Sequence, residues 1–515
     1  MRENPQVAIV GAGPAGLSAA AVLARCGARV TAYDENDRPG GQLFKQIHKF
    51  FGSGHHGAGV RGVELGRQLL AECEAAGVEI CLSHAVYGIF PGGRLGVTHA
   101  GYGRIIRAEK ILIATGATEK ALAFPGWDLP GVMGAGAAQT MVNLNRVLPG
   151  RRIIMVGSGN VGLVVGFQLL QAGAHLAAVV EARSQISGYA VHANKLMRAG
   201  VPILTGHTVL EARGRDSVEE VTIGRVDERY RPIPGTERTI ETDTVCLAVG
   251  LTPSIELLRM ANVGLTHLPP MGGLSAAVQR HPVYHQSGYL CGRRCGRDRG
   301  GQHGHGRRPT GRDGHCRGAG PAGGSRSRAA DGGDPPACGP AANRPPRGSP
   351  RRRQSGTGEE VCPVAEQLKR GPHAVIECTE EIPCNPCCTA CPQGAITMAE
   401  GLSSLPCLNR GKCTACGLCI PCCPGQAIFV IDDTYSGSEG LLSLPFEFTP
   451  LPIVGQSVIL TDRRGRPVGE GTIHRVLCPP AFRQTAVVTL RVPLALLDTV
   501  RGFLPTSGKE VLHEG

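Results

Sequence analysis

The chain has 515 residues, 42 % of them hydrophobic, and a formal net charge of +12. This length exceeds what one hydrophobic core serves, so we expect three or four domains. No uninterrupted apolar run reaches the ~18 residues of a membrane-spanning helix. The run from Val7 to Ala24 is broken by glycines and a proline, unlike the core of a secretory signal. We therefore expect a cytoplasmic protein without a membrane span.

The positive charge and the 21 cysteines further limit which functional classes of protein fit the sequence. Residues 280–356 contain 16 arginines, no lysine and four aspartates, which account for the whole excess charge. The rest of the chain is formally neutral, so the charge does not indicate a nucleic-acid-binding protein. Dense cysteine in a chain without an export signal indicates metal sites more than disulfides.

A dinucleotide-binding fingerprint follows a short buried strand near the N-terminus. Gly11, Gly13 and Gly16 open a helix, and the next strand ends at Asp34 and Glu35. These glycines allow a tight turn, a close approach of the backbone to a pyrophosphate, and close packing of helix on strand. The N-terminus of the helix then faces the phosphates. We expect Asp34 to bind a ribose hydroxyl, with Glu35 as the alternative.

The fingerprint recurs about 145 residues later at Gly157, Gly159 and Gly162, and the strand after that helix ends at Glu181. A carboxylate there accepts hydrogen bonds from the 2′-hydroxyl of NAD and repels the 2′-phosphate of NADP. We therefore favour NAD(H), although Arg183 leaves NADP open. The spacing favours an NAD domain inserted into an FAD domain over two unrelated Rossmann domains.

Several segments around these fingerprints resemble the pyridine nucleotide–disulfide reductase superfamily. Residues 38–42 are similar to its FAD-binding half, residues 111–117 to the strand and turn that leave the FAD domain, and residues 245–250 to the returning strand. The resemblance implies an FAD cofactor. It also implies contacts with the nucleotides from Gly41, Gln42, Val86, Thr115, Gly116 and Gly250.

The redox dithiol of disulfide reductases is missing, because residues 40–45 lack cysteine and no Cys-x-x-Cys lies within residues 124–250. Residues 41–46 and 124–139 instead resemble the α-subunit family of heteromeric amine and amino-acid dehydrogenases. That family includes relatives of sarcosine oxidase α, opine oxidase, hydrogen cyanide synthase and dye-linked proline dehydrogenase. The resemblance covers roughly residues 5–275. It implies a partner flavoprotein subunit that oxidises a small-molecule amine or amino acid.

A cysteine-rich segment follows the pattern of bacterial ferredoxins. Cys413, Cys416, Cys419 and Cys423, the last before a proline, match that pattern fully. Three close thiolates hold one 4Fe–4S cluster, and the fourth ligates the other cluster. Zinc is the weaker interpretation, because it usually takes two separated Cys-x-x-Cys pairs.

An upstream motif repeats this pattern with one deviation. Its first ligand is expected at position 381, which is a glutamate, and the nearest preceding cysteine is Cys378. We predict that one cluster is held by Cys378, Cys384, Cys387 and Cys423. We predict that the other is held by Cys391, Cys413, Cys416 and Cys419. Three further cysteines are interpreted as packing residues: Cys388, Cys407 and Cys422. A single cluster beside a degenerate first motif remains the alternative.

Residues 291–356 contain no Val, Ile, Leu, Met, Phe, Trp or Tyr, so they cannot build a core and we expect them to be disordered. The superfamily resemblance implies a strand ending in Ala-Gly-Asp here, whose acid binds the flavin. Possible codons for residues 291–306, read one base later, give Val-Ala-Gly-Asp and then Ile-Glu-Glu-Ala-Ser-Thr-Ala-Met. We hypothesise that residues 280–356 are translated out of frame, which would weaken FAD binding. A genuine Arg/Gly linker, an RNA-binding tract and a zinc site are the alternatives.

We thus predict an α/β protein with two Rossmann-like domains, the NAD domain being inserted in the FAD domain. The FAD domain takes residues 1–120 and 251–279, and the NAD(H) domain takes 121–250. An α+β ferredoxin-like domain with two 4Fe–4S clusters is expected at 370–433. Alternating apolar and polar residues predict a small β-rich domain at 440–515.

These cofactors predict an electron-transfer enzyme. Hydride carries two electrons whereas an iron–sulfur cluster accepts one, and a flavin connects the two. We expect an oxidoreductase subunit that moves electrons between NAD(H), FAD and the clusters, without a nominated catalytic side chain. One alternative is a stand-alone NAD(P)H:ferredoxin or NAD(P)H:acceptor oxidoreductase. Another is a defective electron-relay protein.

Overall fold

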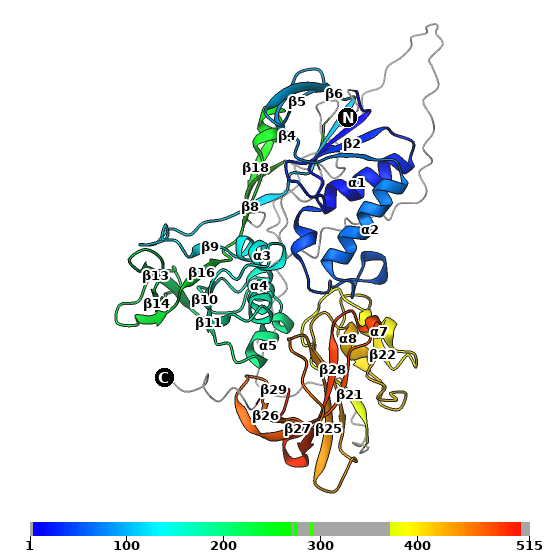
Figure 1. The fold of residues 1–515 in the computed structure, drawn as a ribbon, viewed down its shortest axis with the longest axis vertical. Helices are drawn as coiled ribbons and strands as arrows, with labels where there is room; N and C mark the ends of the chain where they lie inside the picture. The colour runs from blue at the N-terminus through cyan, green and yellow to red at the C-terminus, as the bar shows by residue number, and fades with distance from the viewer. Residues whose placement is uncertain (1–3, 270–271, 277–288, 292–370, 506–515) are drawn as a thin grey trace, which may run out of the picture. The chain divides into compact units, whose positions relative to one another are not determined.

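The computed structural model describes residues 4–269, 272–276, 289–291 and 371–505. They all belong to one of the two units into which the chain divides, and Figure 1 labels many of their helices and strands. The segment 280–356 lies outside the described residues except for three positions, so its disorder and reading frame stay hypotheses. No helix in the described ranges has the length and apolar character needed to cross a bilayer.

The N-terminal part contains a parallel sheet in the order β20-β7-β1-β2-β3. Its central strands are fully buried, as expected of a parallel sheet with covered faces. Helices α1 (Pro14–Arg25) and α2 (Gly62–Ala75) pack against each other. The strands are β1 (Val7–Val10), β2 (Val30–Tyr33), β3 (Glu79–Cys81), β7 (Lys110–Ile113) and β20 (Tyr289–Cys291).

Strand β20 lies within the segment that is hypothesised to be out of frame. It pairs in parallel with β7, with Tyr289 opposite Ile111 and Cys291 opposite Ile113. Residues 289–291 therefore extend the sheet of the first Rossmann-like part.

A second core on this part is completed by residues that come much later in the chain. An antiparallel meander packs with helix α6 (Glu256–Met260) and with Ala276, and these residues share a core with β1 and β7. The meander consists of β4 (Ala85–Phe90), β5 (Arg94–His99) and β6 (Tyr102–Arg107). The hairpin β18 (Leu265–Leu268) and β19 (Gly273–Ala276) follows α6. The chain thus returns to this core after the inserted part.

The inserted part repeats the same architecture with a parallel sheet in the order β12-β11-β10-β16-β9. These strands are β9 (Val132–Gly134), β10 (Arg152–Val156), β11 (His175–Glu181), β12 (Ile203–Thr205) and β16 (Thr244–Leu247). Its helices are α3 (Ala135–Asn143), α4 (Asn160–Gln171) and α5 (Ala190–Arg198). A meander covers it with β13 (His207–Arg213), β14 (Glu220–Arg225) and β15 (Arg238–Glu241). The prediction of two Rossmann-like parts, one inserted in the other, is confirmed.

Two antiparallel strands connect these parts: β8 (Ala117–Glu119) leads out and β17 (Leu251–Pro253) leads back. Pairing of the outgoing and returning segments brings the residues predicted at the two exits together. Ser254 N donates to Gly116 O at 3.1 Å, and Lys120 N donates to Gly250 O at 3.0 Å. Both glycines have positive φ, +74° and +123°, a conformation that glycine adopts without strain.

The C-terminal part contains a seven-stranded sheet in the order β21-β24-β25-β28-β27-β26-β29. It combines two strands of the cysteine-rich segment, β21 (His373–Ile376) and β24 (Ile428–Asp432), with five later ones. The boundary expected between residues 433 and 440 falls between β24 and β25, which are hydrogen-bonded neighbours. The later strands are β25 (Glu439–Phe446), β26 (Ser457–Thr461), β27 (Pro467–Leu477), β28 (Ala486–Pro493) and β29 (Gly502–Pro505).

The cysteine-rich segment adds two short helices and a hairpin to that sheet. They are α7 (Pro386–Ala390), α8 (Cys419–Cys422), β22 (Ile396–Met398) and β23 (Pro406–Leu408). Each helix contains cysteines of one motif and each motif leads into a strand, β22 or β24. Their small core is built largely from cysteine, isoleucine and valine side chains.

Candidate nucleotide and iron–sulfur sites

The first glycine loop has the geometry of a phosphate cradle. A side chain at Gly11 would collide with Ala114 O, and one at Gly16 would collide with Gly11 O. These two positions therefore need glycine for the turn and for helix packing. A side chain at Gly13 would meet no atom within 4 Å. Gly13 is the N-cap of α1, so free space and unpaired helix N–H groups lie together where a pyrophosphate would bind.

The acid at the end of β2 anchors this loop. Asp34 is buried, and its Oδ2 accepts a hydrogen bond from Ala12 N at 2.7 Å. Its Oδ1 accepts hydrogen bonds from the backbone and side chain of Asn36 at 2.9 and 2.8 Å. An ionised carboxylate has about four acceptor positions, so ribose hydroxyls can still bind. Glu35, the alternative, is exposed.

The Gly40-Gly41 turn lies directly against the cradle. Gly40 N donates to Ala12 O at 2.7 Å, and a side chain at Gly41 would come within 3.0 Å of Gly13 Cα. The short helix η1 (Gly41–Lys45) starts here, with Gln42 exposed. Val86 lies half-buried on β4, and Thr115 Oγ1 contacts Ser254 O at 3.4 Å. Gly41 and the backbone of Thr115 thus lie against the glycine loop, whereas Val86 packs against the core that contains Ala8 and Val10.

The second glycine loop repeats these features. Side chains at Gly157 and Gly162 would collide with Ala248 O and Gly157 O, whereas one at Gly159 would meet nothing within 4 Å. Gly159 is the N-cap of α4, with ordinary φ and ψ of −64° and 165°. Backbone strain therefore does not require glycine at this position. The free space at the N-terminus of α4 instead has room for a second pyrophosphate.

Glu181 is buried at the end of β11 and serves as the counterpart of Asp34. It accepts hydrogen bonds from Ser158 N and Oγ at 3.0 and 2.6 Å, from Arg183 N at 2.9 Å and from Ser187 Oγ at 2.9 Å. Burial alone raises the pKa of this carboxyl, but the bonds from Ser158 and Arg183 lower it overall. The side chain is thus held as a carboxylate where a nicotinamide nucleotide's ribose would bind.

The eight predicted cluster ligands divide between two cavities. One cavity, called here the inner cavity, is lined by the thiols Cys378, Cys384, Cys387 and Cys423 together with Phe51 and Val191. The other, the outer cavity, is lined by Cys391, Cys413, Cys416 and Cys419. The three cysteines interpreted as packing residues, Cys388, Cys407 and Cys422, line neither cavity. Among the described side chains, no group of three or more His, Cys, Asp or Glu is spaced for a single metal ion.

The two proline-preceding cysteines have matching surroundings. Ala395 N donates to Cys391 Sγ at 3.2 Å, and Ala427 N donates to Cys423 Sγ at 3.5 Å. In each case the donor lies four residues after the cysteine, as the internal repeat requires. At Cys391, burial opposes ionisation, but backbone hydrogen bonds to the sulfur outweigh it and lower the pKa of the thiol, and so favour the thiolate, which is the form that ligates iron.

Each of the two cavities contains one buried thiol, Cys387 or Cys419. Burial and the neighbouring Cys423 raise the pKa of Cys378 to about 11, and burial with neighbouring thiols raises the pKa values of Cys384 and Cys387 further. In the outer cavity, Cys416 is exposed and Cys419 is buried. A bound cation stabilises the thiolate over the thiol, so occupation of the inner cavity must release protons.

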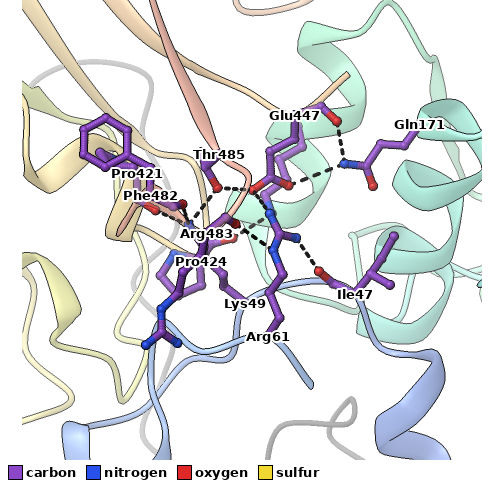
Figure 2. A network of polar contacts seen from close by, with 11 residues as sticks. Ile47, Lys49, Arg61, Gln171, Pro421, Pro424, Glu447, Phe482, Arg483 and Thr485 are labelled. Atoms are coloured by element: carbon purple, nitrogen blue, oxygen red, sulfur yellow. Dashed lines mark hydrogen bonds and ion pairs between the residues drawn. The ribbon is translucent and has the colours of Figure 1, made fainter. Parts of the chain in front are cut away.

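Residues 46–61 connect the flavin-side turn to the inner cavity, which sequence reasoning did not foresee. Asn385 N donates to Gly52 O at 3.0 Å, and Phe51 packs against His192 with ring centroids 5.1 Å apart. Lys49 and Arg61 on the same loop reach into the C-terminal part (Figure 2). In the sequence, Lys49 is marked only by its aromatic neighbours, and that pattern does not indicate which residues Lys49 contacts in the fold.

The architecture and paired cradles define a two-dinucleotide oxidoreductase. The chain belongs to the pyridine nucleotide-disulphide oxidoreductase family, whose model matches residues 5–270. The family match ends before the cysteine-rich segment and has no bearing on its ligands.

Three curated relatives indicate which branch of the family the chain resembles. The chain is 32 % identical to the HcnB subunit of hydrogen cyanide synthase from Pseudomonas aeruginosa, over 51 % of this chain and 60 % of that protein. It is 30 % identical to an opine oxidase subunit from Agrobacterium tumefaciens, over 50 % and 54 %. It is 28 % identical to the alpha subunit of sarcosine oxidase from Rhizobium meliloti, over 48 % and 24 %. The chain spans at most 60 % of the length of these relatives. The predicted resemblance to this group is confirmed.

Two solved structures match part of this chain. L-proline dehydrogenase from P. horikoshii matches with a TM-score of 0.42 and 21 % identity, over 56 % of this chain and 50 % of that chain. Thioredoxin reductase from T. acidophilum matches with a TM-score of 0.45 and 20 % identity, over 56 % and 90 %.

Proposed function

We propose that the chain is a subunit of an FAD-dependent oxidoreductase that moves electrons between NAD(H), FAD and two 4Fe–4S clusters. The observation that carries the proposal is the pairing of two open glycine cradles with two four-cysteine cavities in one chain. When bound, the flavin would exchange two electrons with the nicotinamide and single electrons with the clusters. We assign the FAD to the cradle at Gly13 and NAD(H) to the cradle at Gly159.

In this scheme, the chain's own residues bind the cofactors and orient them. The carboxylates of Asp34 and Glu181 fix both glycine loops and accept ribose hydroxyls, and Glu181 disfavours a 2′-phosphate. The backbone donors at Ala395 and Ala427 hold two thiolates in place. No side chain is assigned to proton transfer, since hydride transfer needs mainly positioning of its two partners.

We further propose a partner flavoprotein subunit that oxidises an amine or amino acid. Its support is the similarity to subunits named for opine oxidase and sarcosine oxidase, together with the absence of a dithiol in residues 40–45. The runner-up is a stand-alone NAD(P)H:acceptor oxidoreductase. Co-expression with candidate flavoprotein genes separates them: a stable complex with amine-dependent reduction of this chain supports the first, and full NADH turnover by the isolated chain supports the second.

The cofactor proposal is tested by anaerobic purification with analysis of FAD, iron and acid-labile sulfide. Two neighbouring cysteines supply a matched pair of variants. Cys387→Ser should remove one cluster because Cys387 lines the inner cavity, whereas Cys388→Ser should keep both because Cys388 lines neither cavity. Wild-type protein without iron, or equal iron loss in both variants, would reject the two-cluster assignment. Colourless protein that retains the fold would favour the defective relay.

A further inference from the structure

Three buried cations converge behind the loop that carries Cys423. Lys49, Lys195 and Arg61 are only 4, 6 and 8 % exposed, although they come from the flavin-side loop and from α5. Among the described residues, Glu447 is the carboxylate that interacts with all three. Its Oε1 lies 3.1 Å from Arg61 Nη2. The group therefore has more positive than negative charges.

Lys49 is held as an ammonium by its hydrogen bonds. Its Nζ donates to Pro421 O, to Phe482 O at 2.9 Å and to Thr485 Oγ1 at 2.7 Å (Figure 2). Thr485 Oγ1 donates its own hydrogen to Glu447, so it accepts from Lys49. Three acceptors require three N–H groups, which a neutral amine lacks. The positive charge follows from this geometry.

The cations donate hydrogen bonds to backbone carbonyl groups on both sides of Cys423. Lys49 binds Pro421 O, and Lys195 Nζ donates to Pro424 O at 2.6 Å. Arg198, on the same helix as Lys195, donates to Gln426 O at 2.9 Å. The inner cavity, lined by Cys423 and Pro424, lies on this loop.

Uncompensated buried cations are costly, and they persist in proteins where an anion balances them. Four thiolates around a 4Fe–4S core leave a net negative charge, which grows on reduction. We propose that Lys49 and Lys195 are positioning residues that supply the counter-charge to the inner cluster and raise its reduction potential above that of the outer cluster. This inference rests on the proposed function, because it requires both clusters.

Charge and hydrogen bonding near the sulfurs are established controls of cluster potential. At an effective dielectric constant of about 20, one unit charge within about 12 Å changes a one-electron equilibrium about tenfold or more. A tenfold change corresponds to about 59 mV for one electron. Removing one lysine charge should therefore lower the inner potential by roughly 59 mV, while the outer potential moves less.

The test is EPR-monitored redox titration of the full chain, purified without oxygen, with dithionite as reductant. Cys387→Ser and Cys416→Ser, each removing one cluster, assign the two signals. Lys49→Met and Lys195→Met should each make the inner cluster about tenfold harder to reduce. Lys49→Arg and Lys195→Arg keep the charge and should retain the wild-type potential. Lys412→Met is the control, because Lys412 is adjacent to Cys413 yet exposed, so solvent screens its charge.

Equal shifts of both clusters, no shift in the Met variants, or the same shift in the Arg and Met variants would overturn the proposal. Met variants that lose only the inner cluster, while Arg variants keep both at unchanged potentials, would support it. Loss of both clusters from Met and Arg variants alike would reject a role of charge. Absence of iron from the wild type would instead reject the proposed function itself.

Discussion

Glu447 is the residue whose replacement should destabilise the C-terminal part most clearly. Its side chain is only 9 % exposed, its Oε1 lies 3.1 Å from Arg61 Nη2, and its Oε2 accepts a hydrogen bond from Gln171 Nε2 at 3.4 Å. Glu447→Gln keeps the size of the side chain but leaves three buried cations without a carboxylate. Removing one partner of a buried ion pair costs about 3–5 kcal/mol. For a cooperative unit of about 150–250 residues this corresponds to a fall in melting temperature of roughly 6–20 °C.

The matched control is Glu72→Gln, because Glu72 forms an ion pair of similar length, 3.3 Å, with Arg25 at the surface. Both side chains are about half exposed, so its loss should cost less than about 1 kcal/mol. Melting of the cluster-free proteins is followed by circular dichroism at neutral pH. If Glu447→Gln lowers the melting temperature no more than Glu72→Gln does, the buried network does not contribute as reasoned.

The pH dependence gives an independent check on the same residue. Burial raises the pKa of Glu447, but Arg61 and Lys195 outweigh burial and lower it below its usual 4.5. A carboxyl whose folded pKa is depressed contributes stability above its unfolded pKa and loses it as pH falls through the folded pKa. Burial lowers the pKa values of Lys49 and Lys195 to about 8, so these cations are charged at and below neutral pH. The difference in melting temperature between wild type and Glu447→Gln should therefore be largest between about pH 5.5 and 7 and shrink below about pH 4.5. A difference that persists undiminished at lower pH would contradict the assignment.

Three further predictions concern the nucleotide sites and the gene. Gly159→Val fills the open space before α4 at an ordinary φ of −64°, so the protein should fold but bind NADH at least about tenfold more weakly by fluorescence titration, with its FAD content unchanged. Glu181→Gln removes the charge that opposes a 2′-phosphate, so the ratio of NADPH to NADH affinity should rise about tenfold; an unchanged ratio would remove Glu181 from the site. Resequencing of the gene should find a frame change that affects the segment 280–356, and repairing it should raise the FAD content of the purified protein; an intact frame would reject the hypothesis.

The nucleotide cradles were predictable from sequence because their physics is local. Gly16 is dictated by a contact with Gly11 within one strand–turn–helix unit, whereas Gly11 also needs glycine because Ala114 at the end of β7 lies against it; the six-residue pattern still identifies both positions. Cys378 is a harder case, because spacing alone pointed to position 381. Glu381 is exposed, whereas the chain after β21 turns so that Cys378 lines the cavity with Cys384. Spacing rules assume a fixed loop, and Pro383 lies within this one.

The shared C-terminal sheet was not predictable by the same reasoning. Alternating apolar residues identify β24 and β25 as strands, but strand periodicity does not say which strands pair. Their pairing, with Val430 opposite Ser443, joins the cysteine-rich segment to the later strands. A boundary drawn from composition therefore fell inside one sheet.

The cluster of buried charges was likewise not predictable from the sequence, because it forms only when the chain folds. Outside residues 280–356 the chain is formally neutral, so its charge count predicts no imbalance. Lys49, Lys195 and Glu447 are distant in sequence, and only folding gathers them where solvent cannot screen an excess of cations. Such an excess is unfavourable unless an anion completes it. The inner cavity offers four thiols on that side, and as thiolates around a bound cluster they would supply the balancing negative charge that the proposal requires.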